Sequence, residues 1–569
     1  MRYMKISLLI RSKSSYYALC FSLLFFACTL AGFDFDNYGS CFVVSASSVA
    51  WSIVCACIAF SCALLLFRVV EINRGLSRCS LYISFSPKLF FLTCTIILLA
   101  WMPYYLACFP GLYVYDAVTQ LYYSLGIGVI SSYHPLIHTY WLAGFLSLGS
   151  SFFGSYSAGF AIYTFSQMLV MSACFAFVLC SLRQLCARRF VYFFSLATVC
   201  LFPVFPILAI SATKDSAFSA LFAVFIVQLV KLCWREADFM SSRVEVIALF
   251  ISSLLSGLFR NNAMILICLV LIALIFIYRF NRRFISIILI PCLVLLMLLG
   301  YLLPKTISQS TSNSSEILGL PIQQIARTML YESDSMSGDE KNSVVSMIPS
   351  WNLYNQRIVD PIKFSGKTSQ VISDDLSTFL RLWFKLGMEH PCDYIDAFVA
   401  QTEGFWNLFS NYDAVGTTKP YLEFDQWAVI GPGVLGRDMG QAGYDVYEVE
   451  DIDNWIIPAK HSLLPCLLPI VRKLCYEPFW MKSLFFRAVT SPALVFWSAV
   501  LLVFVSVRYR KWKLLLPTVT IIGYMMTCLL GPCYLIRYAF PFYACAPILL
   551  SLIFGLFDSK ELSGSCISS

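Results

Sequence analysis

Charged residues are scarce in this chain. Asp, Glu, Lys and Arg make up 13% of its 569 residues, about half the share of an ordinary soluble domain. Apolar and aromatic residues supply 59%, and the mean hydropathy is +0.76. This balance excludes a soluble globular enzyme, a disordered protein and a nucleic-acid-binding domain. Many apolar runs reach the roughly 20 residues that cross a bilayer, so we predict an all-α polytopic membrane protein.

The sequence also has no CxxC pair, although it contains 23 cysteines. Most of them lie inside the apolar runs, where a thiol behaves as a small hydrophobe. Neither a zinc site nor a thiol redox motif is indicated, and no cofactor is expected. A divalent metal has no support in the sequence, although nothing there excludes one.

Acidic and basic residues are unevenly distributed. Residues 304–483 hold 22 Asp and Glu against 14 Lys and Arg, whereas the rest of the chain holds 10 acidic and 26 basic residues. Short basic loops mark the cytoplasmic side of a membrane protein. We therefore predict a protein of the cell membrane with both termini cytoplasmic and 304–483 external. The basic loops are the N-terminus, 68–88, 183–189, 235–243, 279–283 and 508–513.

About 12 membrane spans fit this charge pattern. The first sits where a signal peptide would, but its apolar core is long and lacks a clear cleavage site, so we read it as a retained anchor. The pair at 244–278 is short, with Arg260-Asn261-Asn262 as its outer turn. The predicted spans are 15–33, 46–67, 89–109, 157–181, 191–211, 216–234, 244–259, 262–278, 284–303, 484–507, 514–533 and 538–557.

One apolar stretch, 135–149, is predicted not to cross the membrane. If it crossed, the basic loop at 183–189 would face outward. The stretch is short and carries His138 and Thr139, so we interpret it as an amphipathic helix on the outer surface. The predicted organisation is N-terminal membrane helices (1–109), a first external loop with surface helices (110–156), central membrane helices (157–303), an α-rich external domain (304–483) and C-terminal membrane helices (484–569).

This topology gathers the unusual polar residues at the outer face. They are separated by more than 400 residues of sequence, and ionisable groups at the edge of a membrane are costly and usually functional. Acidic side chains among several bases indicate a polar site for an anionic, lipid-linked ligand. The groups are Asp116 and His134 in the first external loop, Lys214-Asp215, Arg260-Asn261-Asn262 and Arg537-Tyr538.

Each of these residues alone has an ordinary alternative. Asp116 fits a helix N-cap or a solvated loop acid. Arg260 and Arg537 fit snorkelling anchors. Lys214-Asp215 fits a simple turn, and His134 fits a surface histidine before a proline. The prediction of a site therefore depends on their coincidence at one face.

Two segments of the first external loop resemble a family pattern. Pro110-Gly-x4-Asp116-x3-Gln120 is similar to the Asp loop of the C-type (GT-C) glycosyltransferases, and Tyr133-His134-Pro135-Leu136 is similar to the segment that begins their surface helix. This family includes protein O-mannosyltransferases, oligosaccharyltransferases and the aminoarabinose transferases of lipid A. Ala117 stands where the family usually has a second acidic residue, which argues against metal-dependent chemistry.

More segments resemble an uncharacterised bacterial family of multispanning, GT-C-like proteins, and they run through most of the chain. That family has no assigned reaction, so glycosyl transfer is an analogy at the level of fold. The segments are the Asp116 loop, Ala212-Thr-Lys214-Asp215-x2-Phe218, Phe259-Arg-Asn-Asn262, Leu320-Pro-Ile-Gln323-Gln324-Ile-Ala-Arg327, Lys385-Leu-Gly-x2-His390-Pro391-x2-Tyr394-x2-Ala397, Gln401-Thr-x-Gly404-Phe-Trp406 and Arg537-Tyr538-x2-Pro541.

The resemblance implies transfer of a sugar from a polyprenyl phosphate to a cell-envelope glycan, lipid or protein. Asp116 would act as general base on the acceptor hydroxyl. Arg537, Arg260 and Lys214 would stabilise the departing phosphate. The residues expected to orient the substrate are His134, Asp215, Asn261, Asn262, Gln120, Gln324, Arg327 and Trp406. The last three lie in 304–483, and for them the alternative is a local role in holding helices together.

Two other classes of function stay open. A transporter or flippase would place ionisable groups near the bilayer midplane on broken helices, often with inverted repeats. The sequence has no internal repeat, and its spans contain few charges. A polymerase or ligase of lipid-linked sugars would work at the same face as a transferase, and the sequence does not separate the two. In each case the expected partners are the bilayer and a polyprenyl-linked sugar, with no nucleic acid.

Overall fold

Long apolar helices form most of the protein. The computed structural model describes residues 13–75, 85–113, 117, 120, 134–185, 189–279, 281–307, 318–363, 367–410, 462–476 and 479–554. Within these ranges, eight helices are long and apolar enough to span a membrane. The protein is thus an all-α, multi-pass membrane protein. The eight are α2 (Lys13–Tyr38), α3 (Ala46–Gly75), α4 (Pro87–Ala107), α7 (Tyr156–Leu185), α10 (Lys214–Trp234), the segment Ile285–Ile307 that contains α15 (Ile290–Leu295) and α16 (Leu303–Ile307), the segment Trp512–Leu529 that contains α28 (Leu515–Leu529), and α29 (Ile536–Phe554).

The four remaining predicted spans correspond to shorter or broken helices. α8 (Arg189–Leu201) ends just before Pro203, and α9 (Val204–Ala209) follows it, because proline has no backbone N–H to continue the ladder. α12 (Arg243–Phe259) and α13 (Asn261–Ile277) have 17 residues each, a rise of about 25 Å against a hydrocarbon core of about 30 Å. α26 (Leu484–Thr490) and α27 (Pro492–Arg508) meet at a bend of 57° and count as a ninth span if taken together. The total of 12 therefore stays a prediction.

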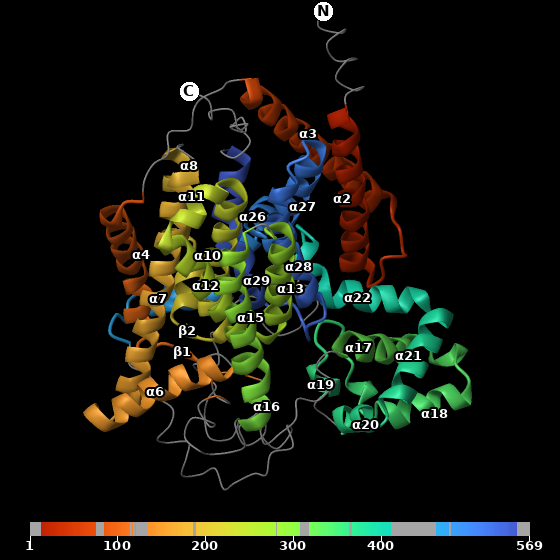
Figure 1. Ribbon diagram of the computed structural model, residues 1–569. Coiled ribbons are helices and arrows are strands. Elements are labelled where there is room, and N and C mark those ends of the chain that lie inside the picture. Colours follow the sequence, from red (N-terminus) through yellow and green to blue (C-terminus); the bar gives the residue numbers. More distant parts are fainter. Residues whose placement is uncertain are drawn as a thin grey trace, which may run out of the picture.

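The centre of the bundle is α10 (Figure 1). Its spanning window is buried throughout, as expected for a helix that is apolar on all sides. It packs against α7, α12 and α29. Two short parallel strands, β1 (Leu112–Tyr113) and β2 (Ser211–Ala212), pair just ahead of it. They connect the start of the first predicted external loop to the N-terminus of the central helix.

Ion pairs join α10 and α12 at both of their ends. Lys231, in the last turn of α10, lies 2.6 Å from Glu245 in the first turn of α12. Asp215, in the first turn of α10, pairs with Arg260 at the end of α12. The two helices are therefore antiparallel, and each charge complements the dipole of its own helix end.

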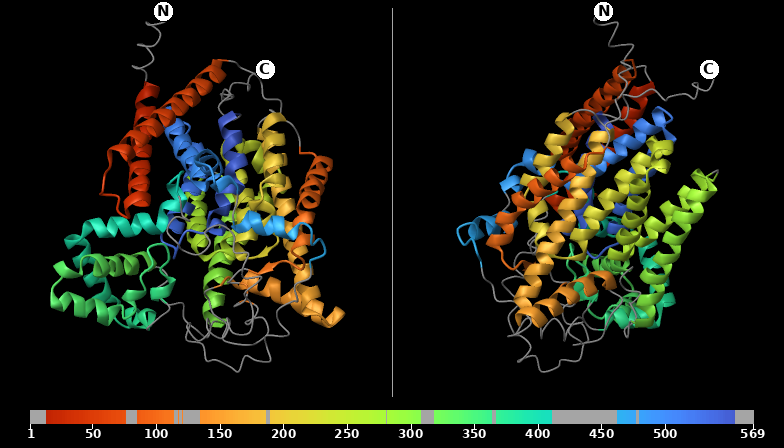
Figure 2. Two further views of the ribbon diagram at one scale, coloured as in Figure 1. Left: turned by 180° about the vertical axis from the view of Figure 1, so that it is seen from behind. Right: turned by 60° about the vertical axis from the view of Figure 1, so that its left-hand side comes forward.

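The two ends of the bundle differ (Figures 1 and 2). α2 begins and α29 ends at one end of the bundle, and α11 (Glu236–Ser241) lies toward the same end. A layer of helices gathers at the opposite end, with its own apolar core that includes Ile325 and Phe379. Which end is external stays a prediction. The layer comprises α17 (Gly319–Tyr331), α18 (Gly338–Met347), α19 (Asp360–Lys363), α20 (Thr368–Asp374), α21 (Leu376–Glu389) and α22 (Pro391–Trp406).

The stretch predicted not to cross forms most of α6 (Leu136–Phe153). α6 lies across the bundle at the same end as α17–α22 (Figure 1). It is not among the eight helices of spanning length and apolarity. Its polar residues His138 and Thr139 are buried, so they face the protein and contribute to packing rather than to a solvated helix face.

Labelling of native cysteines tests the predicted orientation in the membrane. We expect a membrane-impermeant maleimide to label intact cells at Cys392, which is exposed in the first turn of α22, and at exposed Cys466. A cysteine at exposed Ser241, the last residue of α11 at the other end, should react only after permeabilisation. Replacing Cys392 and Cys466 by serine is the control and should remove the outside signal. Labelling of Ser241→Cys in intact cells would reverse the predicted orientation.

Candidate functional site

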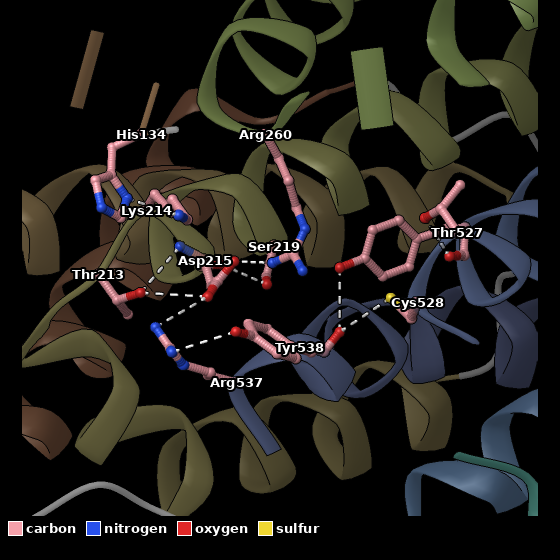
Figure 3. Close-up of polar contacts among 11 residues, drawn as sticks. His134, Thr213, Lys214, Asp215, Ser219, Arg260, Thr527, Cys528, Arg537 and Tyr538 are labelled. Carbon is pink, nitrogen blue, oxygen red and sulfur yellow. Dashed lines mark hydrogen bonds and ion pairs between the residues drawn. The ribbon is translucent and has the colours of Figure 1, made fainter. Parts of the chain in front are cut away.

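Two arginines from distant parts of the chain converge on one buried carboxylate (Figure 3). Arg260, between α12 and α13, forms an ion pair with Asp215 of α10. Arg537 Nη1, at the start of α29, lies 3.8 Å from the second carboxylate oxygen of Asp215. Asp215 is fully buried, and the two arginines are 7% and 6% exposed. We call these three residues the outer charge cluster, after the outer face at which the sequence predicts them.

The start of α10 sets the position of Asp215. Thr213 is the N-cap in an extended conformation, and its hydroxyl oxygen accepts the Asp215 backbone N–H at 3.3 Å. The same hydroxyl donates to Asp215 Oδ2 at 3.3 Å. An acid in the first helical turn also interacts favourably with the helix dipole. The residues Thr213-Lys214-Asp215 therefore define both the helix start and the anionic centre of the cluster.

Aromatic rings surround the Arg260 guanidinium. Its central carbon lies 4.9 Å from the ring centroid of Tyr538 and 5.7 Å from those of Phe218 and Tyr524, which are cation–π distances. Arg260 Nε is buried and has no hydrogen-bond acceptor among the described residues. An unsatisfied donor of this kind costs about 1–3 kcal/mol. It marks a point where an oxygen atom of a ligand would be stabilised.

Lys214 lies next to the cluster and contacts His134 (Figure 3). Its Nζ atom is 3.1 Å from His134 Nδ1. Because a lysine ammonium can only donate, Nδ1 must be the accepting nitrogen, and the ring proton sits on Nε2. The contact thus presents a cation and a neutral imidazole side by side.

A buried polar chain leads from α6 to the segment before α10. His138 Nδ1 lies 2.8 Å from the side-chain amide of Gln120, and His138 Nε2 lies 2.7 Å from the Tyr163 hydroxyl. Tyr163 donates to Gln167 at 2.8 Å, and Gln167 donates to backbone carbonyls at the end of α9 and in β2. These bonds fix α6 against the start of the central helix, which gives Gln120 a structural partner.

The other predicted residues of this region fall elsewhere. Asp116, the candidate base, lies outside the described residues, and β1 ends three residues before it. Asn261 and Asn262 are exposed in the first turn of α13 and are not part of the buried cluster. The predicted residues that the structure brings together are Lys214, Asp215, Arg260, Arg537 and His134.

The three predicted residues in the layer α17–α22 make scaffold contacts. Gln324 donates to a backbone carbonyl of α22 at 3.1 Å and accepts from an α21 indole at 2.8 Å. Arg327 lies 3.1 Å from Asp396 and donates at 2.9 Å to the Gly39 carbonyl beyond α2. The Trp406 carbonyl accepts the indole N–H of Trp497 on α27 at 2.8 Å. These contacts fit the alternative of a local helix scaffold.

A second ion cluster, which the sequence did not indicate, joins this layer to α2. Arg357 is fully buried; it forms an ion pair with Glu403 of α22 and lies 3.3 Å from Asp36 of α2. Burial, together with the neighbouring Asp36 carboxylate, raises the pKa of Glu403 to about 8. No local motif connects these three positions, so only the fold could reveal the cluster.

This cluster predicts a pH-dependent attachment of the layer. Glu403 has a folded-state pKa of about 8 against an ordinary value of 4.5, so the folded protein holds a proton that the unfolded chain releases. The contribution of Glu403 to the free energy of unfolding is complete below pH 4.5, and it is lost as the pH rises through about 8. Thermal unfolding of the purified protein in detergent, followed by tryptophan fluorescence, should therefore show a falling midpoint between about pH 5 and pH 9.

Glu403→Gln is the matched variant for this prediction, because the amide keeps the shape and cannot ionise. Its midpoint should depend less on pH than that of the wild type. Arg357 and Asp36, which face Glu403, remain unchanged in the variant. An identical pH profile for both proteins would contradict the assignment to Glu403.

The residues that the structure describes contain no group of three or more His, Cys, Asp or Glu side chains able to hold a metal ion. The fold and the cluster define a multi-pass α-helical membrane protein with a polar centre at one end of its bundle. Residues 128–561 match a protein family of unknown function, DUF6020. The match covers well over half of the chain and includes the whole outer charge cluster; the protein belongs to this family. No curated protein and no solved structure matches the chain.

Proposed function

We propose that the protein is a GT-C-type glycosyltransferase that moves a sugar from a polyprenyl-phosphate donor to a cell-envelope acceptor at the outer face. The observation that carries this proposal is the pair of buried guanidiniums around Asp215, with the unsatisfied Arg260 Nε beside them. Arginine forks bind phosphate oxygens bidentately. Asp215 holds both forks in position before a donor binds.

The proposed reaction uses one base and several cations. Asp116 accepts the proton of the acceptor hydroxyl while the hydroxyl oxygen bonds to the anomeric carbon of the sugar. The bond from that carbon to the phosphate oxygen breaks, and the polyprenyl phosphate leaves with the electron pair. Arg260, Arg537 and Lys214 stabilise the charge that develops on it.

The position of the cluster favours a transferase over a transporter. Asp215, Arg260 and Arg537 all belong to helix ends at one end of the bundle, whereas transporters bind their substrates near the bilayer midplane. A polymerase or ligase of lipid-linked sugars is the second candidate, since it would need the same phosphate-binding groups. In this proposal the protein lies in the cell membrane with cytoplasmic termini, and α17–α22 face the acceptor.

The test is an assay in proteoliposomes with a labelled pool of polyprenyl-linked sugars and a cell-envelope extract as acceptor. We expect label to pass to the acceptor. Movement of intact labelled lipid across the bilayer, with its sugar–phosphate bond unbroken, would replace the transferase with a flippase. Polymerisation of the sugar on its own carrier would identify the second candidate.

Arg537→Lys probes the fork within the same assay. Lysine keeps the charge but loses the bidentate geometry, so the KM for the lipid donor should rise about 10-fold. The KM for the acceptor should change little. Arg472→Lys, at an exposed arginine of α25 (Leu468–Tyr476), is the matched control. A larger effect on the acceptor than on the donor would contradict the assignment of Arg537 to phosphate.

A further inference from the structure

A small cavity lies where α26 meets α27. Thr490, Ser491 and Pro492 line it at the bend, and Ile536 lines it from the start of α29. Arg537, the residue after Ile536, belongs to the outer charge cluster. The cavity and the cluster are therefore separate sites that share the first turn of α29.

The cavity contains several hydrogen-bond donors. Arg487 Nη1 and Nη2 donate to the carbonyls of Phe409 and Met481 at 3.2 and 3.0 Å, and its buried Nε has no acceptor among the described residues. Ser410 and Asn407, which are 8% and 2% exposed, also line the cavity. In the described structure the Ser410 hydroxyl and the Asn407 amide nitrogen have no hydrogen-bond partner. The Asn407 amide nitrogen lies against Gly32 of α2, which does not line the cavity. Arg487 Nε and the Ser410 hydroxyl are therefore two buried polar groups at one cavity that need an explanation.

The charges around the cavity point to an anion. Arg487 supplies a fixed positive charge, and the N-terminus of the 17-residue helix α27 begins at the cavity with Ser491 as its N-cap. The dipole of a helix favours an anion at its N-terminus. The backbone itself offers no free donor there, because Pro492 has no N–H and Ser491 accepts the N–H groups of Ala493 and Leu494. The described residues that line the cavity include no aspartate or glutamate. Among the described residues no carboxylate pairs with Arg487, so an anion would supply a counter-charge that a neutral ligand would not.

The surroundings of the cavity suit the phosphate group of a lipid. α26 exposes Phe485 (69%), Phe486 (48%) and Val489 (53%) beside it, and such side chains pack against acyl chains at a membrane interface. The cavity has a volume of about 20 Å³. One water molecule needs roughly 10–15 Å³ on the same measure. Oxygen atoms of a phosphate group can enter while its ester substituent extends outward.

We propose that this cavity is an anion site that binds a phosphate group, carried by a phospholipid or free in solution. Arg487 and the N-terminus of α27 neutralise its charge, and Ser410 donates a hydrogen bond to it. The site does not depend on the proposed function, because none of its polar residues belongs to the outer charge cluster.

The test is binding to the full-length protein in nonionic detergent, measured by native mass spectrometry and by the thermal midpoint. The probes are phosphatidylglycerol, inorganic phosphate and an uncharged diacylglycerol of the same chain length. Retention of phosphatidylglycerol alone identifies a lipid headgroup, and a response to inorganic phosphate identifies the free anion. Equal retention of phosphatidylglycerol and diacylglycerol, with no response to phosphate, would overturn the proposal.

Two variants separate binding from folding. Arg487→Gln should weaken binding of the responding probe at least about 10-fold. Ser410→Asp leaves the Arg487 bonds to the two carbonyls in place but adds a negative charge, so it should also abolish binding while the thermal midpoint is kept. Arg472→Gln, on the exposed face of α25, is the charge-matched control and should bind as the wild type does. Binding of the probe by Ser410→Asp as tight as that of the wild type would refute the site. This outcome is independent of the sugar-transfer assay that tests the proposed function.

Discussion

Asp215→Asn is expected to destabilise the protein by about 3–5 kcal/mol, the range measured when one partner of a buried ion pair is removed. The carboxylate is fully buried and is shared by two guanidiniums that are themselves less than one tenth exposed. An asparagine keeps the shape but cannot neutralise either charge. The two arginines would then repel each other in a poorly solvated place.

The measurement is the thermal midpoint and the yield of monodisperse protein in detergent. Asp215→Asn combined with Arg260→Gln removes one charge of each sign and should recover part of the loss, since the penalty comes mainly from the uncompensated cation. Asp334→Asn, at an exposed acid of the layer α17–α22, is the control. A midpoint for Asp215→Asn equal to that of Asp334→Asn would show that Asp215 does not balance the arginines.

Asp116→Asn is expected to lower sugar transfer by about 10²-fold or more while folding and membrane insertion stay intact. The replacement preserves shape and removes the proposed general base. It should therefore change kcat in the proteoliposome assay and leave the thermal midpoint near that of the wild type. This is the opposite outcome to that of Asp215→Asn, and the pair of variants separates a chemical role from a structural one.

Two results would change the assignment of Asp116. Transfer at the wild-type rate would leave the enzyme class standing but remove Asp116 as base. A large loss of stability together with activity would indicate a structural carboxylate. Asp374→Asn, at an exposed helix-terminal acid, controls for a change of charge alone.

The sequence alone was informative where one physical effect dominates. The largely apolar run 216–234 predicts a membrane span, and α10 extends over Lys214–Trp234. The sequence also assigned Lys214, Arg260 and Arg537 to one membrane face, because basic loops and apolar runs alternate along the chain. It could not show that Asp215 is the residue between the two arginines, since that contact depends on how α10, α12 and α29 pack.

The prediction of membrane spans from the length of apolar runs was weakest where a proline interrupts the helix. The run 191–211 reads as one span, but Pro203 divides it into α8 and α9. The run 484–507 is likewise interrupted, with extended backbone at Ser491 ahead of Pro492. The Arg357–Glu403–Asp36 cluster had no signal at all, because its members come from a loop, a helix of the layer α17–α22 and the end of a span.

The two ion pairs that join α10 and α12 have a mechanical consequence. Sliding one helix past the other by a turn, about 5.4 Å, would separate Lys231 from Glu245 and Asp215 from Arg260 at the same moment. Each separation would leave charges with little water around them. The two ion pairs therefore hold α10 and α12 in one fixed register relative to each other. In the proposed transferase, motions that admit a donor or release a product would therefore use segments with fewer ion pairs, such as the bend between α26 and α27.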